Sequence, residues 1–323
     1  MTNHITFAYS FDGKGKGSAL EKTQISKHIK SKNLAWVHLD ANNPETKLWL
    51  EKEISYLDPY VIEALLAEET RPRMTQIDDG ALIILRGVNL NDNSTPEDMV
   101  SIRIWIDKHR IISIYKRNLK AIEDIVESIT KGSGPKNAGD FISLLVEKLF
   151  ARINPVLSEL DDNTDHLEES IIENANTKLR EDIVSIRKKA IIFRRYMSPQ
   201  RDAIAQLRMS NLKWLNELNK RHLQESYNNI TRYIEDLDAI RERAQIIKDE
   251  LASIIAEKLN KNMYTLSVIA AIFLPLGFLT GLLGINVAGI PGADNSDAFM
   301  NFIGILAFIV LLQIAIFKKF KWF

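Results

Sequence analysis

The chain has 323 residues, with 42 Lys and Arg against 42 Asp and Glu, 46% hydrophobic residues and no cysteine. This apolar content excludes an intrinsically disordered chain, and the missing cysteines exclude a disulfide scaffold and a thiolate zinc site. A net charge of zero argues against a nucleic-acid-binding protein, which would be basic. These averages fit a soluble globular protein, but they do not show where along the chain the apolar residues lie.

The first part of the chain alternates between short β-branched runs and short amphipathic segments, which predicts a mixed α/β domain. Residues 1–17 contain no apolar run, so we expect no signal peptide. Gly13–Ser18 lacks the spacing of a phosphate-binding loop and is interpreted as a flexible turn. The expected strands are Ile5–Phe11, Ala35–Leu39, Ala81–Asn89, Val100–Asp107 and Ile111–Lys116, with a tight hairpin between the last two, and the expected helices are Pro44–Ile54, Pro59–Glu68 and Ala121–Ile129.

After the glycine-rich linker the pattern changes to long helices. Asp140 is the expected N-cap of the first, and Pro155 should kink it. Ser198-Pro199 is expected to end the second helix and to begin another. The last helix begins near Arg221 and meets no breaker before Met263, so it should continue directly into the apolar region that follows. A rod of this length needs partners, which favours several copies of the chain.

Charged and titratable residues of the helical part suggest no catalytic centre. The acidic run Glu159–Glu173 is interpreted as a solvated face, with a metal-attracting surface as the alternative. Its expected partners are the basic residues of the next helix, Arg187, Lys188, Lys189, Arg194 and Arg195. The six histidines show no pair at ligand spacing, so each is interpreted as a surface or hydrogen-bonded residue. With no nucleophile–base pair in the pattern, we expect no enzyme.

Two uncharged runs near the C-terminus, Met263–Ile285 and Ala298–Phe317, are each long enough to cross a bilayer. A buried hairpin of a soluble core is the alternative, but core helices rarely carry two such runs in succession. The loop between the two runs has two Asp and no Lys or Arg, whereas lysines precede the first run and follow the second. The positive-inside rule therefore predicts a two-span membrane protein with both termini in the cytoplasm and the short loop outside.

One face of the first apolar run is made of small and aliphatic residues. Helical steps of about 100° place seven residues in one sector of about 80°: Met263, Leu266, Ala270, Leu274, Gly277, Gly281 and Gly284. Two interpretations stay open at this point. Gly277 and Gly281 form a GxxxG pattern, which is typical of close helix packing, or the face lines a pore. Two helices cannot enclose a polar path, so a pore requires an oligomer.

Several segments then carry a family resemblance. Gly284-Ile285-Asn286, directly after the first apolar run, resembles the Gly-x-Asn signature of the CorA-type divalent-cation transporters. Ile290-Pro291-Gly292 resembles the zinc branch of that family, the ZntB-like transporters, whereas the Gly-Met-Asn and Met-Pro-Glu-Leu segments of the magnesium branch are absent. Further segments similar to the zinc branch are Glu69–Arg73, Leu85–Asn89, Arg194–Asp202 and Phe273–Gly281. The resemblance covers essentially the whole chain.

The resemblance implies an α+β funnel-shaped homopentamer in which the first membrane helix lines the pore. Gly284, Ile285 and Asn286 would form the selectivity filter at the outer entrance. The implied pore-lining residues are Asn260, Met263, Leu266, Leu274 and Gly277, which coincide with the angular sector that also holds Ala270 and Gly281, and this agreement favours a pore. Asp249 matches a regulatory metal-binding aspartate of the magnesium branch. The expected organisation is a cytoplasmic α/β domain (1–135), a helical stalk (136–262), a pore-lining span (263–285), an external loop (286–297), a second span (298–317) and a basic tail (318–323).

The chemistry of the chain suits an ion that is passed along and not held. Without cysteine or paired histidine, zinc would be bound weakly enough to be released. Amide oxygens of Asn286 and Asn260 would hold a hydrated cation. Asp294 and Asp297 would attract cations to the entrance, or would simply keep an exposed loop soluble.

The expected function is zinc transport, with a magnesium, cobalt or nickel channel as the first alternative and a membrane-anchored scaffold as the second. We expect no cofactor, the transported ion being zinc, or else magnesium or cobalt. The expected partners are other copies of the chain, the lipid bilayer and divalent cations, with no nucleic acid. Neither span contains an Asp, Glu, His, Lys or Arg residue, so proton coupling would need a carrier outside them, such as Asp249, Asp294 or a histidine.

Overall fold

The computed structural model describes residues 4–68, 70–174, 178–285, 290, 292 and 295–320, with only the backbone at 173–174. The chain divides into two compact units, Met1–Asp249 and Glu250–Phe323. The predicted selectivity-filter residue Asn286 and the predicted loop residue Asp294 lie outside the described residues, whereas Asp297 lies inside them. Each unit is described by itself below.

The first unit contains a seven-stranded sheet in the order β2-β1-β3-β7-β6-β5-β4. Its strands are β1 (Ile5–Phe11), β2 (Gly17–Ala19), β3 (Ala35–Asp40), β4 (Arg73–Ile77), β5 (Gly80–Gly87), β6 (Val100–Ile106) and β7 (Arg110–Tyr115). Only β3 and β7 pair in parallel; the other neighbours are antiparallel. The predicted hairpin between β6 and β7 is confirmed, and the Asp107 carboxylate closes it by accepting from the backbone N–H groups of His109 and Arg110 at 2.8 and 3.0 Å.

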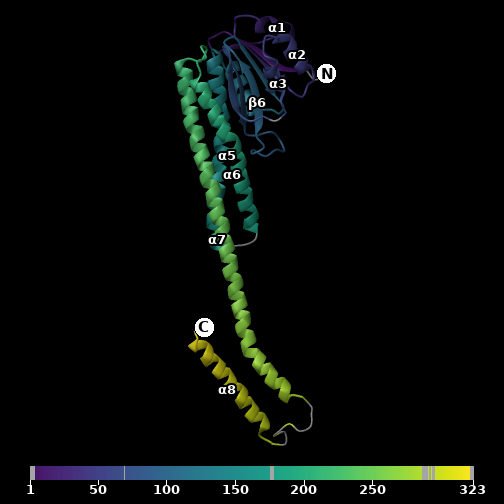
Figure 1. The fold of residues 1–323 in the computed structure, drawn as a ribbon, viewed down its shortest axis with the longest axis vertical. Coiled ribbons are helices and arrows are strands. Elements are labelled where there is room, and N and C mark those ends of the chain that lie inside the picture. The colour runs from purple at the N-terminus through teal and green to yellow at the C-terminus, as the bar shows by residue number, and fades with distance from the viewer. Residues whose placement is uncertain are drawn as a thin grey trace. The chain divides into compact units, whose positions relative to one another are not determined.

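Helices cover both faces of this sheet, so its central strands consist of nearly continuous apolar residues. The helices of the first unit's N-terminal half are α1 (Lys22–Ile29), α2 (Glu45–Glu53) and α3 (Pro59–Leu66), followed by α4 (Lys120–Thr130). Side chains of α1–α3 share one buried core with Val37, Leu82 and Ile112 of the sheet. On the other face, Trp36 packs edge-on against Phe141, with 4.8 Å between ring centroids. Figure 1 shows the sheet between the helices of its two faces.

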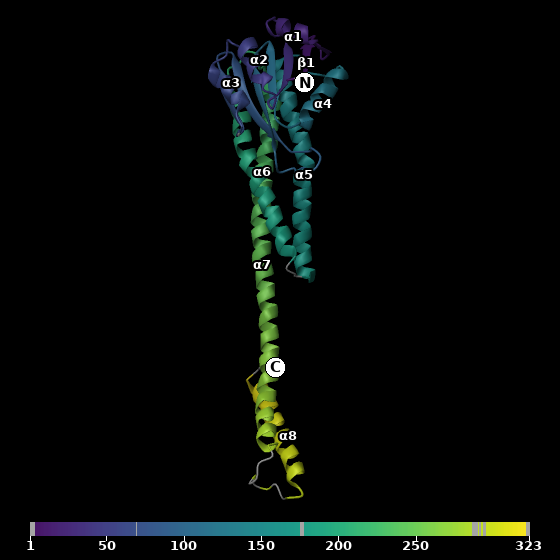
Figure 2. The ribbon, with the colours of Figure 1, turned by 90° about the vertical axis from the view of Figure 1, so that its right-hand side faces the viewer.

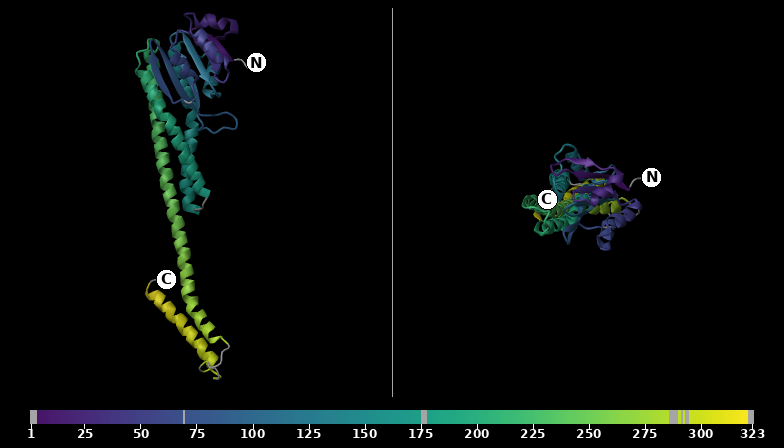
Figure 3. Two further views of the ribbon diagram at one scale, coloured as in Figure 1. Left: turned by 45° about the vertical axis from the view of Figure 1, so that its right-hand side comes forward. Right: turned by 90° about the horizontal axis from the view of Figure 1, so that it is seen from above.

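Three long helices complete the first unit: α5 (Ala138–Asn174), α6 (Lys178–Met209) and the first part of α7 (Glu217–Leu283). They run side by side in all the views (Figures 2 and 3). Their contact faces bury apolar side chains at helical spacing, including Leu145, Phe193 and Leu237. Helix α7 begins with a reciprocal pair of hydrogen bonds between Asn216 and Asn219, in which each backbone N–H donates to the other residue's side-chain oxygen at 3.2 and 2.9 Å.

Two helix-boundary predictions are wrong. Helix α5 begins at Ala138, and the cap is Asn137, whose Oδ1 accepts from the N–H of Asp140 at 2.9 Å. Helix α6 continues through Pro199 instead of ending there. Packing outweighs the local preference at this point, because Gln200, the residue after the proline, is buried and its Oε1 accepts from the backbone N–H of Arg86 at 2.7 Å. Pro155 lies inside α5, and the kink expected there stays a prediction.

The Gly13–Ser18 segment is an ordered turn and not a flexible one. The Asp12 carboxylate accepts from the backbone N–H groups of Lys14 and Lys16 at 2.7 and 3.0 Å. These hydrogen bonds to the ionised form hold the pKa of Asp12 below its usual range. Gly13 and Gly15 take positive φ angles of 73° and 108° there, a backbone region that favours glycine.

The second unit contains the last part of α7 and helix α8 (Ala298–Lys319). Both α7 and α8 are long and apolar enough to cross a membrane. Helix α7 is continuous over 67 residues, as the missing breaker predicted, although it begins four residues earlier than expected. The bounds expected for the membrane spans, residues 263–285 and 298–317, stay predictions.

Candidate functional site

The small-residue face of α7 is the part of the second unit in which the predicted site residues come together. All of the described members of the predicted set are exposed: Asn260, Met263, Leu266, Ala270, Leu274, Gly277, Gly281, Gly284 and Ile285. Four of them are large apolar side chains, and they are 50–72% exposed. A Cβ atom added at Gly277 or at Gly281 would meet nothing within 4 Å. The GxxxG pattern is therefore not a contact site for the chain's own second span.

The side of α7 that contacts the rest of its unit is a different one. Val268 is buried at 8% exposure, and Ala271, Ile272, Pro275, Leu276 and Leu279 are half-buried. With helical steps of about 100°, this set centres about 150° from Met263, whereas the small-residue face centres about 25° away in the other direction. The two faces are thus nearly opposite. The small-residue face is left free for other copies of the chain or for a passing solute.

Pro275 and Gln313 define the contact between the two helices. The Nε2 of Gln313 in α8 donates to the backbone carbonyl oxygen of Ala271 at 3.2 Å. Thr280 and Ser267 instead donate their hydroxyl groups to carbonyls of α7 itself, Thr280 to Leu276 at 2.9 Å. Gln313 was not among the predicted site residues, although the sequence shows both a proline without an N–H at position 275 and an amide in the second span.

Asp249 is exposed, and Nε2 of Gln245 donates to both of its carboxylate oxygens at 2.9 Å. Among the described residues, no group of three His, Asp or Glu side chains could hold a metal ion. The metal-binding role of Asp249 stays a prediction.

The acidic run of α5 pairs with a different helix from the one predicted. Arg243 of α7 donates to Asp161 and Glu168 at 2.9 and 2.8 Å and also contacts Asp165. These three acids are spaced four and three residues apart, so they lie on the side of α5 that meets α7. Because Arg243 is hydrogen-bonded to Glu168, the pKa of that carboxyl lies below its usual range. Arg243 offsets one of these three negative charges, so the acidic run is paired in part with α7 and keeps a net negative charge.

Arg194, one of the expected partners of the acidic run, pairs elsewhere as well. Its Nε lies 2.6 Å from Oδ1 of Asp238 on α7. Helix α7 thus supplies the opposite charge both to the acids of α5 and to this base of α6. The prediction that α5 and α6 neutralise each other is wrong, because it left out the third helix of the bundle.

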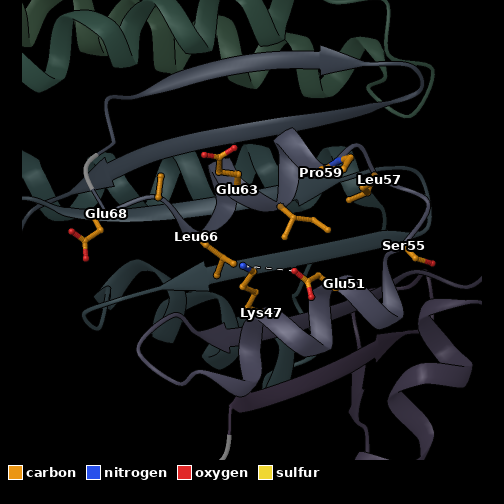
Figure 4. A pocket seen from close by; sticks show the side chains of 10 residues that line it. Lys47, Glu51, Ser55, Leu57, Pro59, Glu63, Leu66 and Glu68 are labelled. Atoms are coloured by element: carbon orange, nitrogen blue, oxygen red, sulfur yellow. Dashed lines mark ion pairs between the residues drawn. The ribbon is translucent and has the colours of Figure 1, made fainter.

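A cavity of about 670 Å³ lies beside α2 and α3 in the first unit. It is lined by three glutamates together with apolar residues such as Leu57 and Leu66. Figure 4 shows Glu51 turned toward Lys47, with which it forms an ion pair at 3.9 Å, while Glu63 and Glu68 point in other directions. The carboxylates do not converge, so the cavity does not resemble a metal centre.

Comparison with known proteins assigns the chain to a family. The sequence model of the family described as "CorA-like Mg2+ transporter protein" matches residues 31–319. The chain belongs to this CorA-like family. The resemblance found in the sequence is thereby confirmed, and a CorA-like chain is a membrane transporter and not an enzyme.

Relatives of this CorA-like chain match it over its full length. It is 33% identical to the zinc transport protein ZntB of Yersinia enterocolitica, an alignment that covers 100% of this chain and 97% of the relative. It is 35% identical to the divalent cation transporter CmaX of Pseudomonas aeruginosa, covering 98% of this chain and 96% of the relative. The solved structure of full-length CmaX matches with a TM-score of 0.86 and 33% identity, covering 100% and 99% of the two chains. The expected fold class, an α/β domain followed by long helices and two C-terminal spans, is confirmed.

Proposed function

We propose that this CorA-like chain transports divalent cations, zinc first among them, across the inner membrane through a pore lined by α7 in a homopentamer. The observation that supports a pore is the small-residue face of α7, which is exposed and lies opposite the side that contacts α8. A single chain leaves this face without neighbours, and several copies arranged around an axis would enclose it. The proposed orientation has both termini in the cytoplasm, and it is supported by the lysines that precede the first span and follow the second.

Zinc is favoured by the relatives, several of which are named zinc transport proteins. The chain's own chemistry supports a carried ion, because the described residues contain no cluster of metal ligands that would retain one. Magnesium is the second candidate, favoured by the description of the matching family. Cobalt and nickel belong with it, as ions of similar charge and size.

The proposed path contains two polar sites separated by apolar rings. Asn286, together with Gly284 and Ile285, forms the filter at the outer entrance, and Asn260 forms a second amide ring at the inner mouth. Between them, Met263, Leu266 and Leu274 line the path along with Ala270, Gly277 and Gly281. Bare divalent cations would be very costly in such surroundings, so the ion passes with part of its hydration shell.

Three acidic residues have proposed roles outside the spans. Asp294 and Asp297 raise the local cation concentration at the outer entrance. Asp249, which is exposed near the junction of the two units, is the proposed ligand of a regulatory cation shared between copies. Neither role requires the chain to hold a resident cofactor.

The deciding experiment measures flux into proteoliposomes that contain the purified chain, with zinc, magnesium or cobalt outside and with or without a pH gradient. We expect zinc uptake. Magnesium flux without zinc flux would refute the zinc assignment, and the absence of flux for every ion would leave a membrane-anchored scaffold as the function. Crosslinking or mass measurement of the intact oligomer tests the pentamer.

The filter is tested with Asn286→Ala, and Asn301→Ala is the matched control because Asn301 is an exposed amide of α8. We expect Asn286→Ala to impair uptake while leaving the oligomer intact, and the control to transport normally. The wild-type chain has no cysteine, so single cysteines can be introduced along α7 without a background. A polar thiol reagent should block transport at residues 263, 266, 270 and 274 and not at 268, 272 and 279.

A further inference from the structure

Pro275 creates a defect in the hydrogen-bond ladder of α7. In an α-helix the carbonyl of residue i accepts from the N–H of residue i+4, so the carbonyl of Ala271 should accept from residue 275. Proline has no N–H, and its ring also crowds the preceding turn. Within a bilayer no water replaces the missing donor, which makes an unsatisfied carbonyl costly.

The structure places a substitute donor at this carbonyl. Gln313 of α8 is half-buried, and its Nε2 lies 3.2 Å from the carbonyl oxygen of Ala271. Apart from Asn301 near its beginning, Gln313 is the one polar uncharged amide of α8. A polar side chain in an apolar helix is unfavourable unless it finds a partner, and here the partner is the carbonyl that the proline leaves without an intrahelical donor.

We propose that Gln313 is a positioning residue of the transporter: its side-chain amide replaces the backbone donor missing at Pro275 and so holds the bent part of α7 against α8. Figure 1 shows α7 changing direction in its yellow-green end, within the second unit. Prolines cause such bends. The inference rests on the proposed function, because positioning matters only if the opposite face of α7 lines the path.

The contact lies on the correct side of the helix for this role. Ala271 and Pro275 belong to the half-buried side, nearly opposite Gly277 and Gly281. Gln313 therefore does not contact a cation in the path. Its loss should alter how the small-residue face is presented and should leave the ion's own binding site unchanged.

A double-mutant cycle tests the proposal with four full-length proteins: wild type, Gln313→Leu, Pro275→Ala and the double variant. Pro275→Ala restores the backbone N–H at position 275, so the Ala271 carbonyl no longer needs the Gln313 side chain as its donor in that background. Two quantities are measured, the thermal stability of the reconstituted oligomer and the KM and maximal rate of zinc uptake in proteoliposomes. Asn301→Leu is the matched control, since it removes the other uncharged amide of α8 at an exposed position.

In the wild-type background we expect Gln313→Leu to lower the maximal rate about 3-fold, and by no more than about 20-fold, which is the range for interhelical hydrogen bonds in membranes. KM should not change. In the Pro275→Ala background the same substitution should change the rate less than about 2-fold. Stability should show the same non-additivity, and Asn301→Leu should show neither effect.

Equal effects of Gln313→Leu in both backgrounds would overturn the proposal, as would no effect in either. A raised KM would also overturn it, because that result places Gln313 in contact with the ion. Wild-type proteoliposomes that carry no divalent cation would instead refute the proposed function. The stability cycle does not depend on flux and would still report whether Gln313 and Pro275 act on the same carbonyl.

Discussion

His38 of β3 makes the first unit sensitive to pH in a direction and by an amount that follow from its surroundings. Its ring is buried, stacked between Phe7 and Tyr115 at 4.8 and 4.6 Å between centroids. Its Nδ1 shares a hydrogen bond of 2.7 Å with Oγ of Ser113. Burial disfavours the charged form and lowers the pKa of His38 from 6.5 to about 3.

The depressed pKa means that His38 stays neutral in the folded chain but is protonated below about pH 6.5 in the unfolded one. The stability it contributes is complete above that pH and declines as the pH falls toward 3. Between pH 7.5 and 5.5 the loss is about 1.4 kcal/mol, since the unfolded state gains one proton over about one pH unit. For a unit of this size the melting temperature should fall by about 3–6 °C.

The assay compares thermal unfolding of the wild type and of His38→Phe at the two pH values, so that the contributions of all other groups cancel in the difference. His166→Gln, at an exposed position of α5, controls for the loss of a histidine. His38→Phe keeps an aromatic ring between Phe7 and Tyr115. When the pH is lowered from 7.5 to 5.5, its free energy of unfolding should fall by about 1.4 kcal/mol less than that of the wild type. Equal losses in the two proteins would refute the reasoning. The same depressed pKa argues against His38 as a proton carrier in transport.

Two further predictions concern the helical bundle and the small-residue face. Arg243→Met should destabilise the first unit by about 1–2 kcal/mol at low salt and by less in 1 M NaCl, because its three carboxylate partners are partly exposed. Urea unfolding measures the loss, and an equal loss at both salt concentrations would contradict this. Gly139→Ala should cost about 1–3 kcal/mol, since the added Cβ would lie 2.1 Å from Oδ1 of Asn219 and 2.9 Å from a backbone oxygen. Gly277→Ala, whose Cβ would meet nothing within 4 Å, is the matched control, and a loss of equal size there would contradict the steric explanation.

Strands β3, β5, β6 and β7 could be predicted because nearly all of their residues are buried, whereas β1 is only partly buried. The predicted β1 agrees with the structure at both ends, and β3, β5, β6 and β7 agree to within one or two residues. The edge strands β2 and β4 were missed, as was α1. Edge strands are short and half-exposed, so their sequences carry little apolar alternation. Strand order was also beyond prediction, because the parallel pairing of β3 with β7 joins residues far apart in the chain.

Local rules failed where tertiary packing opposed them. Pro199 predicts a break by itself, but the helix continues because Gln200 is buried against β5. The partner of Glu168 lies 75 residues away in α7, and spacing within α5 cannot show which of two neighbouring helices supplies it. The small-residue face of α7 could be predicted, since helical steps alone define it. Its partner contact on the opposite side could not, because the pairing of Ala271 with Gln313 depends on how two helices meet.

Because a Cβ atom at Gly277 or Gly281 would meet no atom of the chain within 4 Å, substitutions there can distinguish loss of transport from loss of folding. At most positions of a folded chain a larger side chain is rejected because it disturbs its own fold, so failure to transport and failure to accumulate occur together. At these glycines an added Cβ would meet nothing of the chain itself within 4 Å. Alanine variants here should therefore accumulate in the membrane normally, and a loss of metal uptake in them would report on neighbouring copies and on the transported ion.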